Sequence, residues 1–412
     1  MNSSEAITPP AHEPVLYGSR LRSARSFRQL AAKDVAADLC VSPATLSRLE
    51  KSDSTVIDVD QLTQISFVLG FPRSWFSEAP RAFAANVQPH FRAGSRMTKK
   101  SMDEIKCWWS ALAEMVATID RSVNLKPSHL PSHRDPVQGA IQLRESMGFA
   151  PSEPIPHLIR AAERMGVYVG TCGFDEELHL KNHDASSDWA NLEDRDSVPI
   201  VLCREHSSWE RTRFSFAHEL GHLVLHRFGG SQTKEQEATE FAAELLVPSS
   251  SLHTEWPSRP TILQLLPMKQ KWGISIAALI MHGHRNGLIT DAKKTSLFKQ
   301  LSNGRNPYSN KRWRQDEPGS KERKVERPLL IANAIEVGYG LPPDLDAFYR
   351  DLPRTNGHEI YREFLPNFEC TWSRELNSTK YAPQNVINEP QPDFAWNDNV
   401  ISADFAAHRR YG

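Results

Sequence analysis

The chain has 412 residues, of which 39% are hydrophobic and 24% charged, values typical of a globular protein with two or three domains. Its formal net charge of −1 excludes a global attraction to nucleic acid or to a membrane surface, so any DNA binding needs a local basic patch. The five cysteines form no C-x-x-C pair, which argues against a disulfide framework and against a cysteine zinc cluster. The polar start of the chain and the lack of a long apolar run predict a cytoplasmic protein that makes no membrane contact.

Residues 15–77 carry apolar positions at three- and four-residue spacing, which predicts an all-helical bundle. Ser42 is a candidate N-cap, and Pro43 stands at the first helical position, where a missing N–H does no harm. Two short helices joined there by a tight turn are typical of a helix-turn-helix. Four side chains lie between the inward-facing leucines of the second helix and are the candidates for contact with DNA: Pro43, Ala44, Ser47 and Arg48. Arg48 suits guanine, and the two small apolar residues suit a thymine methyl group.

The stretch that carries this pattern is ARSFRQLAAKDVAADLCVSPATLSRLEKSD, and it resembles the XRE-type (Cro/cI-like) helix-turn-helix family. The resemblance implies double-stranded DNA as a partner. Arg28, Lys33 and Lys51 are candidates for phosphate contacts. The family often has Gln where this chain has Ala32, so one phosphate contact is missing. A helical interaction module that never touches DNA is the alternative.

Residues 78–135 are predicted to form a helical connector, with a basic stretch followed by a long helix. In one interpretation its basic side chains extend the DNA-binding surface. In the preferred interpretation they are exposed to solvent on a connector that does not touch DNA. They are Arg92, Arg96, Lys99 and Lys100.

A second motif, FSFAHELGHLVLH, spans residues 214–226. Positions four apart nearly eclipse on a helix, so His218 and His222 point the same way. In the pattern H-E-x-x-H two histidines hold zinc and the glutamate, here Glu219, is the base. A buried helix with satisfied histidines is the alternative. His226 lies about 12 Å along the axis from His218, too far to share one ion, and is interpreted as a packing or capping residue.

Two short β-branched runs, GVYVG and VPIVLC, are predicted strands. The second lies just before the H-E-x-x-H helix. The neighbouring motif favours an exposed edge strand at this place, which pairs with an extended substrate over the metal. An ordinary strand of a small sheet is the alternative.

Catalytic zinc sites take three protein ligands and leave a position for water, so a third ligand is required. The stretch KEQEATEFAAELLVP is predicted to be an amphipathic helix. On a helical wheel Glu235 lies about 60° and Glu237 about 100° from the centre of the apolar face. Glu235 is therefore the first choice, and Glu237 the second.

The combination of RFSFAHELGHLVLH and EQEATEFAAELLVP resembles the ImmA/IrrE family of zinc-dependent metallopeptidase-like proteins. The resemblance extends from Pro136 to Leu330. It implies a gluzincin-type site, with His218 and His222 as ligands, Glu219 as base and a downstream Glu as third ligand. The family's usual Asn is replaced here by Thr239, which puts its usual support for the metal ligands in doubt. A fused XRE-type domain is a recurring architecture in this family.

The sequence thus predicts a mostly helical α+β fold: a helix-turn-helix bundle, a zincin-like domain with a small sheet, and a C-terminal helical region. The predicted boundaries are 15–77 for the DNA-binding domain, 78–135 for the connector, 136–290 for the peptidase domain and 291–412 for a C-terminal extension that is partly loop or disordered. Residues 303–328 of this extension are polar and basic and are predicted to form an exposed loop.

Two functional hypotheses follow. In the first, the protein is a DNA-binding regulator that is also a zinc endopeptidase, with a repressor or a toxin–antitoxin component as protein substrate. In the second, its metal domain senses or binds a partner without proteolysis, as a regulator or an antitoxin. The intact Glu219 favours the enzyme. A homodimer is a possible oligomeric state under both hypotheses.

Overall fold

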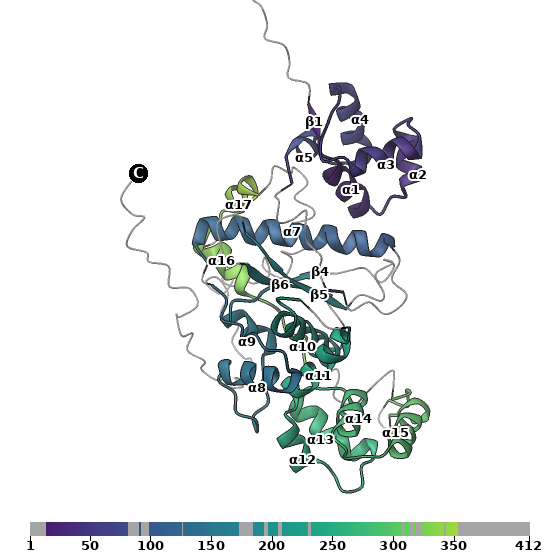
Figure 1. Ribbon diagram of the computed structural model, residues 1–412, viewed down its shortest axis with the longest axis vertical. Coiled ribbons are helices and arrows are strands. Elements are labelled where there is room, and N and C mark those ends of the chain that lie inside the picture. Colours follow the sequence, from purple (N-terminus) through teal and green to yellow (C-terminus); the bar gives the residue numbers. More distant parts are fainter. Residues whose placement is uncertain are drawn as a thin grey trace, which may run out of the picture.

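The computed structural model describes residues 14–80, 90–91, 99–125, 127–172, 184–192, 197–204, 208–229, 232–306, 309–313, 317, 323–341 and 343–352. These residues form a mostly helical α+β structure with two small sheets (Figure 1). Over these ranges, no helix has the length and apolar character needed to cross a membrane. The predicted DNA footprint of Arg92 and Arg96, and the tail beyond residue 352, lie outside the described residues.

The N-terminal bundle is built from short helices and a two-stranded antiparallel sheet. Its elements are β1 (Val15–Leu16), α1 (Gly18–Phe27), α2 (Ala32–Asp38), α3 (Pro43–Lys51), β2 (Thr55–Val56), α4 (Val59–Leu69) and α5 (Arg73–Ser77). The Ser42 hydroxyl accepts a hydrogen bond from the Thr45 N–H at 3.0 Å, so it caps α3 as its sequence position predicted. Gly70 ends α4 with a φ of 66°, a left-handed conformation that glycine adopts at little cost.

The long helix α7 (Lys99–Val123) joins this bundle to the rest of the molecule. One hydrophobic core runs from the N-terminal helices along α7 to α16 (Leu330–Tyr339). Arg20 of α1 forms a buried ion pair with Glu114 of α7, at 3.0 Å. The bundle is thus packed on α7 through both apolar and charged contacts.

The larger sheet contains β3 (His90–Phe91), β4 (Tyr168–Cys172), β5 (Ala185–Ala190) and β6 (Val198–Arg204), in the order β3-β5-β6-β4. β4 is parallel to β6, whereas β5 is antiparallel to both β6 and β3. Helix α7 covers one face of the sheet and α10 (Trp209–Leu225) covers the other (Figure 1).

The expectation that VPIVLC forms an exposed edge strand is wrong. β6 pairs with β4 on one side and with β5 on the other, so its backbone is already hydrogen-bonded in both directions. The strand between β3 and β6 is β5, whose sequence ASSDWA is too polar to be recognised as a buried strand. Long apolar runs are typical of strands covered on both faces, and β6 is such a strand.

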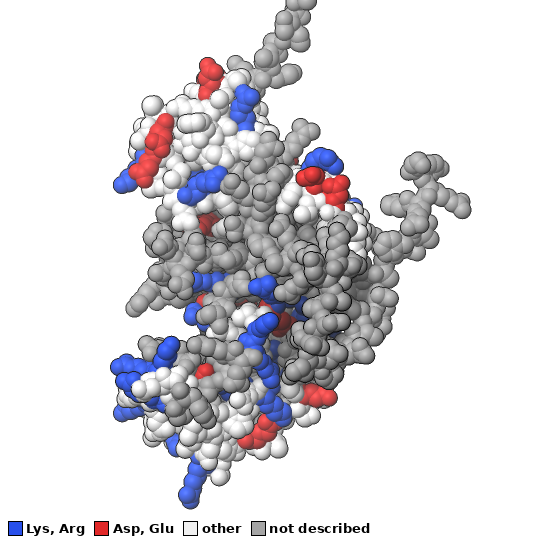
Figure 2. Space-filling view, turned by 180° about the vertical axis from the view of Figure 1, so that it is seen from behind, with Lys and Arg blue, Asp and Glu red and all other residues white. Residues whose placement is uncertain are grey.

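The remaining helices pack around a second core below the sheet. They are α8 (Pro136–Ser146), α9 (Leu158–Arg164), α10, α11 (Lys234–Leu246), α12 (Ser249–Glu255), α13 (Ile262–Trp272), α14 (Ile276–Arg285) and α15 (Asp291–Asn303). Helix α17 (Leu345–Asp351) packs on α16 and belongs to the first core. Inside this part the buried Lys269 ammonium pairs with Glu210 of α10. Lysine and arginine side chains gather on the surface at the α13–α15 end (Figure 2). The exposed basic residues between 285 and 312 are Arg285, Lys299, Arg305, Lys311 and Arg312.

Candidate metal centre

Helix α10 carries the H-E-x-x-H motif across the sheet. The hydroxyl of Ser208 accepts from the Arg211 N–H and caps its first turn. Both His218 and His222 are 1% exposed, and their Nε2 atoms lie 3.2 Å apart. The four-residue spacing therefore aims both ring nitrogens at one point, as the sequence predicts.

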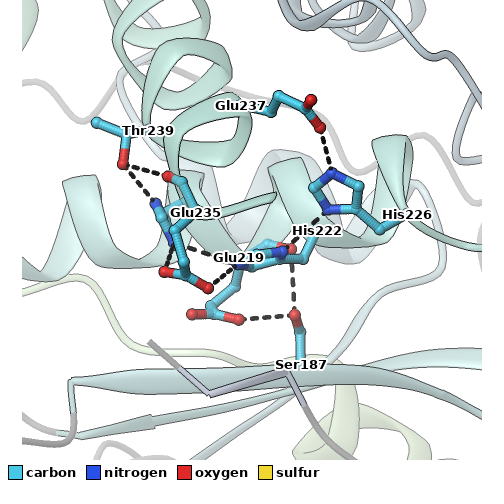
Figure 3. A network of polar contacts seen from close by, with 8 residues as sticks. Ser187, Glu219, His222, His226, Glu235, Glu237 and Thr239 are labelled. Carbon is cyan, nitrogen blue, oxygen red and sulfur yellow. Dashed lines mark hydrogen bonds and ion pairs between the residues drawn. The ribbon is translucent and has the colours of Figure 1, made fainter. Parts of the chain in front are cut away.

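Helix α11 packs against α10 and brings a carboxylate to that point (Figure 3). Glu235 Oε2 lies 3.3 Å from His218 Nε2, and its Oε1 lies 3.3 Å from His222 Nε2. One ligand atom from each of the three residues lies within 4.8 Å of the other two. The structure thus brings Glu235, the first choice from the sequence, to both histidines.

The donor set suits zinc. Two imidazole nitrogens and one carboxylate oxygen form a three-ligand set that leaves a fourth position for water or substrate. The Glu235 side chain is 54% exposed, so this position has access to solvent.

Thr239 fixes the protonation of the first histidine. Its hydroxyl donates to the Glu235 carbonyl oxygen at 2.7 Å, and its oxygen lies 3.3 Å from His218 Nδ1. Since the hydroxyl proton is used on the carbonyl, Nδ1–H is the donor in the second contact. His218 Nε2 then carries the lone pair that a metal needs. Thr239 therefore gives the support that the sequence placed in doubt when Asn was absent.

Glu219 points to the sheet and lies beside the histidines (Figure 3). It is fully buried, and its Oε2 accepts a hydrogen bond from the Ser187 hydroxyl at 2.7 Å. The same hydroxyl lies 3.2 Å from the Glu219 carbonyl oxygen. Ser187 is in β5, so the strand next to α10 orients the candidate base. Ser187 could not be recognised from the sequence, because ASSDWA is too polar to be predicted as a strand.

His226 and Glu237 form a second layer of contacts. His226 caps the C-terminus of α10, as predicted, and its Nδ1 also lies 3.0 Å from His222 Nδ1. Its Nε2 lies 2.9 Å from Glu237 Oε2. Glu237, the second choice for third ligand, thus contacts His226 and not the two Nε2 atoms. The contact between His226 and His222 could have been predicted from the four-residue spacing of the histidines at 218, 222 and 226.

The candidate DNA-contacting residues lie together on α3, in the N-terminal bundle. Pro43, Ala44 and Arg48 are exposed and Ser47 is half-buried. All three candidate phosphate contacts are also exposed: Lys33, Lys51 and Arg28. The third, Arg28, donates to the carbonyl oxygens of Leu69 and Gly70 at 3.2 and 3.1 Å, which ties it to the end of α4.

Residues 162–282 match the family model of the IrrE N-terminal-like domain, peptidase family M78. This segment contains α10 and α11, and therefore the whole cluster of His218, His222 and Glu235. The resemblance to IrrE is confirmed over these residues, and it supports a metallopeptidase-related role for them. No curated protein matches the chain.

Proposed function

We propose that the protein is a transcriptional regulator in which a helix-turn-helix is joined to a zincin-like, zinc-dependent endopeptidase. The observation that carries the enzymatic part is the convergence of His218 Nε2, His222 Nε2 and the Glu235 carboxylate beside the buried Glu219. Zinc is the cofactor that this ligand set and the M78 match favour.

The chain's residues divide the work of peptide hydrolysis. Zinc, when bound by the three ligands, acidifies a water molecule and polarises a carbonyl group. Glu219 takes the proton from that water at its carboxylate and later passes it to the leaving amine. Ser187 holds the Glu219 carboxylate through the 2.7 Å hydrogen bond, so the base does not need to reorganise. Burial of Glu219 keeps bulk water away from the proton transfer.

The test is the substitution Glu219→Gln, which keeps the shape of the side chain and removes its basicity. The variant keeps His218, His222 and Glu235, so we expect unchanged zinc stoichiometry and a cleavage rate about 10²–10⁴-fold lower. The substrate to try is the repressor or toxin encoded beside the protein, with fragments identified by mass spectrometry. The ligand variant His222→Ala is the matched control, since it should lose zinc as well as activity.

The outcome separates the proposal from its rival. Fragments from the wild type alone support a peptidase. No fragments from either protein, together with equal regulation in cells, would point to a metal domain that senses or binds its partner without cleavage.

The DNA-binding part of the proposal rests on the exposed face of α3. Arg48→Ala should remove about 1–3 kcal/mol of discrimination between operator and unrelated DNA. Binding by the wild type should weaken steeply with salt. Arg73→Ala, an exposed arginine of α5, is the control and should leave discrimination unchanged. Equal operator binding by wild type and Arg48→Ala at several salt concentrations would exclude α3 as the recognition helix.

A further inference from the structure

A chain of polar contacts leads from the surface to one of the candidate metal ligands. Glu237 Oε2 lies 2.9 Å from His226 Nε2, and His226 Nδ1 lies 3.0 Å from His222 Nδ1 (Figure 3). The His226 and His222 side chains are 2% and 0% exposed, whereas that of Glu237 is 25% exposed. The chain therefore starts at a carboxylate that water reaches and ends at a fully buried imidazole.

The proton inventory of these groups fixes the direction of each hydrogen bond. A carboxylate only accepts, so His226 Nε2–H donates to Glu237. In a neutral imidazole the other nitrogen is an acceptor, so His226 Nδ1 accepts from His222 Nδ1–H. His222 is left with a lone pair on Nε2, the atom that lies 3.3 Å from Glu235 Oε1.

The opposite arrangement would close the site. If His226 carried its proton on Nδ1 instead of Nε2, it would donate to His222 Nδ1, and the His222 proton would sit on Nε2. A protonated Nε2 cannot bind a metal ion. The contact between Glu237 and His226 therefore selects the form of His222 that can act as a ligand.

Both candidate histidine ligands receive such a partner from α11. Thr239 accepts from His218 Nδ1–H directly, whereas Glu237 reaches His222 through His226. Since α11 also supplies Glu235, one helix provides a ligand and the groups that set the tautomers of the other two. Partners of this kind orient the ring and raise its strength as a donor.

We propose that Glu237 and His226 form a relay that positions His222 for metal binding, and that Glu237 is a positioning residue and not a ligand. This proposal depends on the proposed function in one respect, that zinc is the ion that His222 binds. It does not depend on proteolysis.

The test measures zinc affinity of the full-length protein by competition with a chromogenic chelator. Glu237→Gln and His226→Leu should each weaken zinc binding about 10–100-fold while stoichiometry stays at one ion per chain. The double variant should be no weaker than His226→Leu alone, because Glu237 acts through His226. Glu237→Asp, which keeps the carboxylate, should recover part of the affinity. Glu240→Gln on the same helix is the control and should bind as the wild type does.

A second measurement does not depend on the variants. In zinc-loaded wild type labelled with ¹⁵N-histidine, the imidazole shifts of His226 should report a proton on Nε2, and Glu237→Gln should reduce the population of that form. A proton on His226 Nδ1 in the wild type would overturn the relay. So would wild-type zinc affinity in Glu237→Gln, or loss of stoichiometric zinc in Glu237→Gln with normal binding in Glu235→Gln. A wild type that binds zinc but cleaves nothing would refute the peptidase and leave the relay result standing.

Discussion

Gly221, the glycine inside the H-E-x-x-H motif, offers a sharp test of how closely α10 and α11 must approach. A Cβ atom built at this position would lie 3.1 Å from the Ala238 Cα and from the Phe241 Cδ1, and 3.3 Å from the Ala238 carbonyl oxygen. Two of these atoms belong to the backbone of α11. Gly221→Ala therefore requires the backbone of α11 at Ala238 to give way by a few tenths of an ångström.

The magnitude follows from two opposing terms. Alanine is favoured over glycine in a helix by about 1 kcal/mol, whereas overpacking of a dense interior costs about 1–3 kcal/mol. We expect a net loss of up to about 2 kcal/mol in the free energy of unfolding. The metal site should suffer more, because ligand distances tolerate only about ±0.2 Å and the displaced helix carries Glu235.

The assay compares melting temperature and zinc affinity of Gly221→Ala with those of a matched variant, Gly338→Ala. Gly338 is also helical, but its nearest neighbours, Ser122 Cβ and Val123 Cγ2, lie at an ordinary 3.4 Å. The control should be slightly stabilised, with unchanged zinc affinity. Equal melting temperatures and equal zinc affinities for the two variants would refute the argument that Gly221 sets the distance between the helices.

Three further predictions concern buried polar groups. Burial raises the pKa of Glu163 to about 7 from 4.5, so the stability that its protonated form contributes is fully present below pH 4.5 and is lost as pH rises to 7. The melting temperature of the wild type should therefore fall between pH 4.5 and 8, and Glu163→Gln should remove this fall. Lys269→Ala leaves Glu210 and Glu317 without their shared ammonium partner and should cost about 3–5 kcal/mol. Lys269→Met combined with Glu210→Leu and Glu317→Gln should recover most of this loss, and denaturant unfolding that shows no recovery would contradict this. Ser187→Ala should leave zinc affinity unchanged and lower the cleavage rate, and an unaltered rate would show that this hydroxyl does not hold the base.

The parts of the site that lie on a single helix could be predicted from the sequence. The shared direction of His218 and His222 follows from helical periodicity, and Glu235 was chosen from its angle to the apolar face of α11. Those two arguments needed no knowledge of tertiary structure, and the observed distances of 3.3 Å agree with them.

Contacts between elements could not be predicted in the same way. Ser187 meets Glu219 only because β5 pairs with β6 in one particular register and α10 crosses both strands. A shift of one residue would turn the Ser187 side chain to the other face of the sheet. His226 was excluded as a ligand from its distance to His218 along the helix axis. That argument did not predict that His226 contacts His222 through Nδ1, the ring nitrogen opposite the one that faces the metal site.

The two-residue strand β3 has a practical consequence for dissecting the molecule. It comes from the segment between the N-terminal bundle and α7, and it pairs with β5 at Ser186 and Ser187. A shortened protein that begins at α7 would lack β3 and would leave the N–H and C=O groups of β5 open at the border of the sheet. Open strands of this kind recruit other chains and promote aggregation. A shortened protein that contains the IrrE-like region should therefore begin before His90, so that the sheet keeps its own outer strand.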